Sequence, residues 1–166
     1  MDTENEIWEL VDEEGRATGV LYDRSSGAPI SEGLYFKVVE VWARYGERIL
    51  VTQRHPDKWS GLLWEVSGGG VLAGEENRVA AARELAEEVG IFVHAEELSL
   101  IGVTEHAPAM VYSYFLKLEN EPALSLQESE VVAAKLVSRS ELEEMIDSFT
   151  EGTRIRYSHL SDKLWQ

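Results

Sequence analysis

The sequence predicts a single α+β domain in which a mixed β-sheet lies between helices. Short segments rich in β-branched and aromatic residues recur between turn signals, and each is long enough for one strand. A longer segment at 75–89 consists mainly of strong helix formers and contains neither Gly nor Pro. A chain of 166 residues can bury a sizeable core within one domain. We therefore expect residues 1–166 to fold as one unit.

The N-terminal part predicts a β-hairpin, and the strands of the sheet follow it. Segments 7–11 and 17–22 flank the turn signal Asp12-Glu13-Glu14-Gly15, which indicates a hairpin within an N-terminal extension over 1–30. A glycine loop is expected at 67–70. Strands of the main sheet are expected at 34–45, 48–54, 63–66, 98–105, 110–118 and 131–137.

Three segments predict helices. The first, at 75–89, precedes Gly90, which is a natural C-cap. A second helix is expected at 138–149, where either Ser138 or Ser140 is a suitable N-cap. Ser138 has Glu141 three residues later, which is the capping-box spacing. A further helix is expected at 151–165.

Composition and charge narrow the possible partners. The chain has 31 acidic and 15 basic residues, so its net charge is −16. A negative field of this size disfavours nucleic-acid polymers and anionic membranes as partners, and it favours a bound divalent cation. No apolar run approaches 18 residues, and the acidic start lacks a signal-peptide pattern. Cysteine is absent, which excludes disulfides, thiolate metal sites and a cysteine nucleophile. We expect a cytoplasmic protein.

The helix expected at 75–89 carries an acidic face. Because an α-helix turns by about 100° per residue, Glu84, Glu87 and Glu88 at i, i+3 and i+4 lie on the same side. Carboxylates are hard oxygen ligands, and several on one element suit Mg²⁺ or Mn²⁺. The alternative is a solvated acidic face, although like charges at this spacing repel one another. The opposite face, expected to pack on the sheet, holds Val79, Ala82, Leu85, Ala86 and Val89.

Two other residues of this helix bear on the acidic face. Ala80 lies among the glutamates and is small, so that a loop or a metal ion has room to approach. Arg83 can pair with Glu87 at i+4, or it can hold the preceding loop through its fork of donors.

The spacing of these residues resembles a known family motif. The motif consists of Gly69, then five residues, Glu75, then seven residues, and the run Arg83-Glu84-Leu85-Ala86-Glu87-Glu88-Val89-Gly90-Ile91. Every fixed position of the Nudix box is filled in this sequence. The resemblance implies the Nudix fold, a mixed sheet sandwiched between helices. It also implies a hydrolase that uses Mg²⁺, or Mn²⁺ as a substitute, to cleave a nucleoside diphosphate linked to another moiety or a related diphosphate.

The same resemblance implies roles for individual residues. Glu84, Glu87 and Glu88 are expected to bind the metal, with the backbone carbonyl of Gly69 as a further ligand. Glu75 is expected to orient the loop and Arg83. The residue that acts as general base varies in this family, and the candidates here are Glu84, Glu105, Glu128 and Glu130. The expected catalytic residues are Arg83, Glu84, Glu87, Glu88 and Glu128.

The N-terminal half resembles one branch of the family. The segments 8–19, 53–59 and 63–66 are similar to Nudix proteins related to isopentenyl-diphosphate isomerase. The true isomerases of that branch use a cysteine to move a proton at the allylic carbon. Because this chain has no cysteine, the likeness favours a hydrolase relative over an isomerase.

Three residues outside the box are expected to contact the substrate. Arg54 ends a predicted strand near the glycine loop and is suited to clamp a phosphate; the alternative is a surface arginine. Lys58 has the same two interpretations. Trp64 is suited to stack on a base, and the alternative is a place in the core or at the rim of the site.

We therefore expect a Mg²⁺-dependent Nudix hydrolase that acts on a small-molecule diphosphate. One alternative is the isomerase, which the missing cysteine disfavours. Another is a binder that senses a nucleotide or nucleotide sugar without catalysis, which the complete glutamate set disfavours. The sequence leaves the substrate, the number of metal ions and the oligomeric state open, with a homodimer through the N-terminal hairpin as one possibility.

Overall fold

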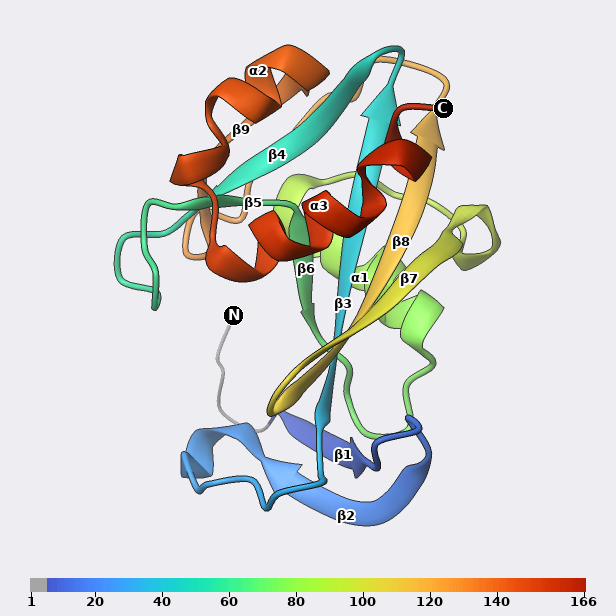
Figure 1. Cartoon of the computed structure of the whole chain (residues 1–166), viewed down its shortest axis with the longest axis vertical. Coiled ribbons are helices and arrows are strands. Elements are labelled where there is room, and N and C mark those ends of the chain that lie inside the picture. The colour runs from blue at the N-terminus through green and yellow to red at the C-terminus, as the bar shows by residue number, and fades with distance from the viewer. Residues whose placement is uncertain (1–5) are drawn as a thin grey trace.

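A mixed β-sheet forms the centre of the structure, a computed structural model that describes residues 6–166 (Figure 1). Its strands follow the order β5-β4-β3-β8-β7, while β6 pairs with β3 and β9 pairs with β4. Strands β3 and β8 are parallel, and the other pairs are antiparallel. The bounds of the strands are β3 Phe36–Tyr45, β4 Arg48–Arg54, β5 Trp64–Glu65, β6 Ser67–Gly70, β7 Ser99–His106, β8 Ala109–Leu118 and β9 Val131–Ser138.

Strands β3 and β4 separate soon after the turn that joins them. They pair only at Arg44↔Ile49 and Tyr45↔Arg48. Beyond that point β3 pairs with β6 and β4 pairs with β5, while β9 pairs with the other edge of β4 from Arg48 to Arg54. Figure 1 shows β4 leaning away from β3 as the two strands run from their shared turn. The sheet is therefore open between these two strands.

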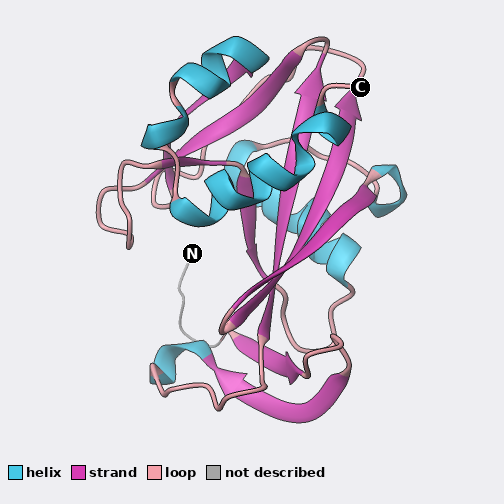
Figure 2. Ribbon diagram, viewed as in Figure 1, coloured by secondary structure: helices cyan, strands magenta, loops and turns pink. Residues whose placement is uncertain are grey.

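Helices cover the two faces of the sheet (Figure 2). Helix α1 (Asn77–Val89) packs on one face, where Leu85 and Val89 join side chains of β3 and β8 in one hydrophobic core. Helices α2 (Arg139–Glu144) and α3 (Glu151–Leu164) cover the other face, where a second core surrounds Trp42. Three short 3-10 segments complete the helices: η1 Arg24–Ser26, η2 Ala95–Glu97 and η3 Ile146–Ser148. Within residues 6–166, every helix is too short or too polar to cross a membrane.

The expected N-terminal hairpin is present. Strands β1 (Ile7–Val11) and β2 (Ala17–Asp23) form a separate antiparallel pair, which joins the main fold through the bridge Val11↔Tyr35. The Trp8 ring stacks on Tyr22 at 5.8 Å and on Phe36 at 4.5 Å between ring centroids. This stack fixes the hairpin against the start of β3. Residues 1–5 of the expected extension lie outside the described residues.

Three local expectations were wrong. The helix expected at 138–149 ends at Glu144, and the separate 3-10 segment Ile146–Ser148 follows it. The expected loop at 67–70 is strand β6, because its glycine backbone pairs closely with β3; a Cβ atom at Gly68 would lie 2.2 Å from the carbonyl oxygen of Val39. The buried face of α1 is also rotated from the expected one. Val79 is 46% exposed, whereas Ala80 and Ala81 are fully buried. Small residues let the helix backbone approach the sheet, and this packing decides which face is buried.

Ser138 caps α2, as the capping-box spacing predicts. Its hydroxyl accepts a hydrogen bond from the Glu141 amide at 3.3 Å, and the Glu141 carboxylate accepts one from the Ser138 amide at 2.7 Å. We expect Ser138→Ala to lower the free energy of unfolding by about 1 kcal/mol, because the substitution leaves an amide of the first turn unpaired. Urea unfolding monitored by circular dichroism measures this loss. Ser140→Ala is the matched control, and an equal loss in both variants would contradict the assignment of the cap.

Candidate active site

A cleft of about 400 Å³ opens where β3 and β4 separate. Residues of β3, β6, α1, α3, the N-terminal hairpin and the loop after β4 line it. Its walls carry more acidic than basic side chains. The acidic ones are Glu6, Glu40, Glu65, Glu84, Glu87, Glu88 and Glu130, and the basic ones are Arg24, Arg54, Lys58 and Arg156.

Strand β6 forms the part of the cleft nearest α1, the helix that carries Glu84, Glu87 and Glu88 and is called the box helix below. A Cβ atom at Gly69 would lie 2.5 Å from the carboxylate carbon of Glu84, so only glycine leaves space for that carboxylate. Burial raises the pKa of Glu84, and the positive charge of Arg83 opposes this effect only in part. The Glu84 carboxylate therefore lies directly against the backbone of Gly69 at the wall of the cleft.

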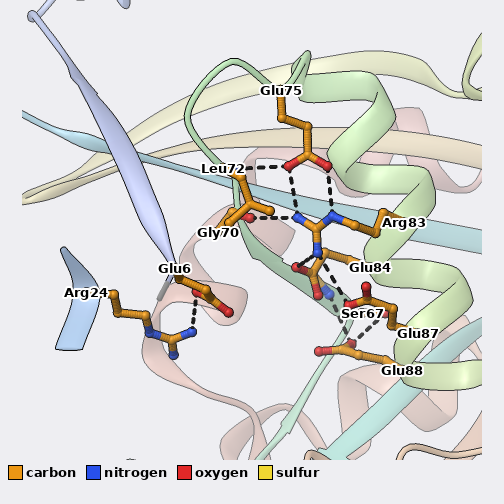
Figure 3. Close-up of polar contacts among 11 residues, drawn as sticks. Glu6, Arg24, Ser67, Gly70, Leu72, Glu75, Arg83, Glu84, Glu87 and Glu88 are labelled. Carbon is orange, nitrogen blue, oxygen red and sulfur yellow. Dashed lines mark hydrogen bonds and ion pairs between the residues drawn. The ribbon is translucent and has the colours of Figure 1, made fainter. Parts of the chain in front are cut away.

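Arg83 connects the loop after β6 to α1 (Figure 3). Its Nε donates to Glu75 Oε1 at 2.7 Å, and a terminal nitrogen donates to Glu75 Oε2 at 3.0 Å. Glu75 Oε2 also accepts a hydrogen bond from the Leu72 amide at 3.0 Å, which ties the loop to the helix. Burial alone would raise the pKa of Glu75, but the hydrogen bonds from Arg83 and Leu72 outweigh it and lower the pKa. The hydrogen bond to Glu75 raises the pKa of Arg83.

Arg83 also contacts two of the box glutamates. One terminal nitrogen lies 2.7 Å from Glu84 Oε1 and 3.4 Å from Glu87 Oε2. The other donates to the carbonyl oxygen of Gly70 at 3.1 Å. Both interactions expected for Arg83, with Glu87 and with the loop, are therefore present. They reduce the repulsion between carboxylates on one helix face.

Glu88 is the most buried carboxylate of the box helix, with 5% of its surface exposed. Its Oε2 accepts hydrogen bonds from the Ser67 hydroxyl at 2.6 Å and the Gly68 amide at 3.2 Å. Burial raises its pKa to about 8; the bond from Ser67 opposes this rise, and the charges of Glu65 and Glu84 add to it. Within residues 6–166, Glu88 forms no ion pair.

The carboxylate oxygens on this wall are the kind of ligand that a hard divalent cation binds. Three carboxylates project from one helix face, and a buried one has no cationic partner among the described residues. Within residues 6–166, no three His, Asp or Glu side chains are already arranged around a single metal position. Glu84 and Glu87 instead contact Arg83. The three carboxylates thus lie on one wall, and Arg83 balances Glu84 and Glu87 but not Glu88.

The three expected substrate-binding residues have different environments. Arg54 lines the cleft, but it donates to both oxygens of Glu65 at 2.9 Å and to the carbonyl oxygen of Trp59 at 2.9 Å. Lys58 also lines the cleft and pairs with Glu130. Trp64 does not line it. Its ring packs on the second core, with the Lys135 ammonium 4.8 Å from the ring centroid, which matches the alternative interpretation of a core or rim position.

Of the expected later glutamates, only Glu130 lines the cleft. The Glu130 carbonyl accepts a hydrogen bond from the His55 amide at 2.9 Å, which holds this residue beside the loop after β4. Glu128, which was expected to be catalytic, is exposed and does not line the cleft. The turn at 127–130 directs Glu130 into the cleft instead. Glu105 lies elsewhere and accepts a hydrogen bond from the Tyr35 hydroxyl at 2.6 Å.

The sequence did not identify Glu40 or Arg156 as site residues. Both line the cleft, from β3 and α3 respectively, and they are separated by 116 positions in the chain. No spacing rule connects residues so far apart. A charged Glu40 within an otherwise apolar strand segment was the signal in the sequence, because such a charge is seldom buried without a partner.

Comparisons with known proteins agree with this geometry. The family model described as NUDIX domain matches residues 34–157. An uncharacterised Nudix hydrolase of Listeria monocytogenes, lmo0368, is 30% identical over 159 residues, which cover 86% of this chain and 86% of that protein. A putative 8-oxo-dGTP diphosphatase of Mycobacterium tuberculosis is 53% identical over 49 residues, which cover 29% of this chain and 34% of that protein.

Solved structures share the fold. DR0079 from Deinococcus radiodurans superposes with a TM-score of 0.71 at 20% identity, over 86% of this chain and 90% of that chain. A bifunctional NMN adenylyltransferase/ADP ribose pyrophosphatase of Francisella tularensis, complexed with AMP and a Mn ion, superposes with a TM-score of 0.69 at 19% identity, over 84% of this chain and 44% of that chain. From the family model and the Listeria relative, with this fold and these box residues, it follows that the chain belongs to the Nudix family of hydrolases, which act on phosphoric anhydride bonds.

Proposed function

We propose that this chain is a Mg²⁺-dependent hydrolase of a diphosphate linkage in a small molecule, with Mn²⁺ as a possible substitute. The observation that carries the proposal is the wall of the cleft where Glu84, Glu87 and Glu88 meet the glycine strand β6, and where buried Glu88 has no ion-pair partner within residues 6–166. These three glutamates, with the carbonyl oxygen of Gly69, would hold the metal. The relatives named for ADP ribose pyrophosphatase and 8-oxo-dGTP diphosphatase activity support a nucleoside diphosphate derivative as the substrate class.

The metal, when bound, would neutralise the diphosphate and lower the pKa of the attacking water. The residues of the chain then have separate tasks. Arg83, held by Glu75, keeps the loop after β6 against the box helix, and it balances Glu84 and Glu87. Lys58 and Arg54 also line the cleft, and each is paired with a glutamate. Glu84 and Glu130 are the two expected general bases that line the cleft.

The alternatives rest on weaker grounds. An isomerase of the isopentenyl-diphosphate type needs an acid in the place of the cysteine that this chain lacks. A sensor without catalysis has no need of every carboxylate of the box. The likeness to the isomerase branch, the cytoplasmic location and a homodimer through the N-terminal hairpin stay predictions.

The first test measures, by chromatography, the phosphomonoester, pyrophosphate or phosphate released with Mg²⁺ from nucleoside triphosphates, nucleotide sugars, dinucleotides and isopentenyl diphosphate. We expect one class to be hydrolysed, and Glu87→Gln to lower the rate by roughly tenfold to a hundredfold or more, because the loss of a carboxylate that only supports a metal ligand already costs about tenfold to a hundredfold. Glu76→Gln is the matched control, since Glu76 is exposed at the start of the same helix and lies outside the cleft. Mg²⁺ binding without release from any compound would favour the sensor.

A second test separates two neighbouring glutamates. We expect Glu130→Gln to lower kcat by about a hundredfold, as for the loss of a general base, because its carboxylate lines the cleft. We expect Glu128→Gln to keep the kcat of the wild-type protein, because Glu128 is exposed outside the cleft. Steady-state kinetics on the substrate found in the first test give both values. A large loss with Glu128→Gln and none with Glu130→Gln would refute this assignment.

A further inference from the structure

A buried ion pair lies in the cleft beyond the box residues. Glu40, on the central strand β3, is only 4% exposed. Its Oε1 accepts hydrogen bonds from Trp42 Nε1 at 2.9 Å and from the Ser113 hydroxyl at 2.6 Å. Its Oε2 accepts one from Arg156 Nε at 2.8 Å. Three donors therefore fix the position of this carboxylate, and the carboxylate in turn fixes the guanidinium of Arg156.

The Arg156 guanidinium keeps its two terminal nitrogens for another partner. Only its Nε donates to Glu40, and within residues 6–166 no carboxylate or carbonyl oxygen accepts from the two terminal nitrogens. The side chain is 12% exposed and lines the cleft. Gly152, one turn earlier on α3, leaves space for the group, since a Cβ atom there would lie 2.9 Å from a terminal nitrogen. The orientation of the Arg156 guanidinium is therefore fixed, while its two terminal nitrogens can still donate hydrogen bonds to a ligand.

Each of the other basic residues of the cleft uses a terminal side-chain nitrogen in an ion pair. Lys58 pairs with Glu130, and Arg24 donates through a terminal nitrogen to Glu6 at 2.7 Å. Arg54 donates through its Nε and through one terminal nitrogen, which reaches both oxygens of Glu65. Among the basic residues that line the cleft, Arg156 is the arginine whose two terminal nitrogens both lack an acceptor within residues 6–166.

Arg156 and the box carboxylates reach the cleft from opposite faces of the sheet. Helix α3 covers one face and α1 covers the other, and Figure 1 shows the two helices on either side of β3. Glu40 is in register with Gly68 across the β3–β6 pair, and the Gly68 amide donates to Glu88. One pair of strand residues therefore separates the Glu40–Arg156 pair from the buried carboxylate of the box. A ligand in the opening between β3 and β4 can meet both walls.

We propose that Arg156 binds phosphate oxygens of the diphosphate substrate through its two terminal nitrogens, and that Glu40 is its positioning residue. The inference rests on the proposed function and adds a second contact for the same substrate. Two parallel N–H donors match the oxygens of a phosphate, and a guanidinium already held at Nε loses little freedom when it binds. The Glu40–Arg156 pair is neutral overall, so it contributes directed hydrogen bonds to the phosphate rather than net positive charge.

The test is calorimetric binding of methylenediphosphonate, a diphosphate analogue with a carbon bridge that is not hydrolysed, with and without Mg²⁺. We expect Arg156→Gln to weaken binding by roughly tenfold or more under both conditions, because charge-assisted hydrogen bonds are lost. Arg154→Gln is the matched control; it removes the same charge from the same helix, outside the cleft, and should bind as the wild-type protein does. Equal affinity of Arg156→Gln and wild-type protein, or no binding by the wild-type protein, would overturn the proposal.

Further variants separate orientation from charge and from misfolding. Arg156→Lys keeps the charge but not the paired donors, so it should recover only part of the affinity, and full recovery would overturn the role of the fork. Glu40→Gln should weaken binding less than Arg156→Gln, since a glutamine still accepts one hydrogen bond. The double variant Glu40→Gln with Arg156→Gln leaves no unpaired buried charge, and its affinity should match that of Arg156→Gln. A double variant that is folded and binds as the wild-type protein does would also overturn the proposal.

The two proposals fail in different ways. If the box carboxylates bind no metal, Mg²⁺ will not strengthen analogue binding, and Glu87→Gln will bind as the wild-type protein does, whereas Arg156→Gln will still weaken binding. If Arg156 does not contact phosphate, the part of the binding that depends on Mg²⁺ will remain in Arg156→Gln and disappear only in Glu87→Gln.

Discussion

The separation of β3 from β4 is the constraint on which the rest of the structure depends. The two strands share a turn but pair at only two positions. After that, each needs another partner for its backbone groups, because unpaired amides and carbonyls are costly in a protein interior. Strand β6 then pairs with β3, and β5 pairs with β4, whose other edge pairs with β9 from Arg48 to Arg54. The opening left between them is the cleft, and both hydrophobic cores lie beside it rather than within it.

Charge balance explains how so acidic a cleft remains folded. Arg83 holds Glu75, Glu84 and Glu87 at once. Glu88 relies on a serine hydroxyl and a backbone amide instead, so its carboxylate remains sensitive to burial. Two other cations of the cleft form separate ion pairs, Arg54 with Glu65 and Lys58 with Glu130. Arg83 therefore balances Glu84 and Glu87, whereas the charges of Glu65 and Lys58 act on the pKa of Glu88 in opposite directions.

Local patterns in the sequence predicted most of the elements, and contacts between distant segments account for the differences. The hairpin, the longer strands, α1 and the Ser138 cap depend on nearby residues, and the sequence predicted them. Strand β6 resembles a loop in composition, but its pairing with β3 decides its conformation. The placement of Glu130 rather than Glu128 depends on a turn that contacts the loop after β4. Arg156 meets Glu40 only through the packing of α3 on the sheet, which no periodicity encodes.

The sequence separations within the cleft also bear on the order in which the chain can fold. The bonds between Arg83 and Glu75 span eight positions, so the loop and helix of the box can close early at small entropic cost. Glu40 instead needs Ser113, 73 positions away, and Arg156, 116 positions away. Those contacts require β3, β8 and α3 to be assembled together, and long-range contacts of this kind form slowly. A partly folded chain would therefore display its acidic helix before the opposite wall exists.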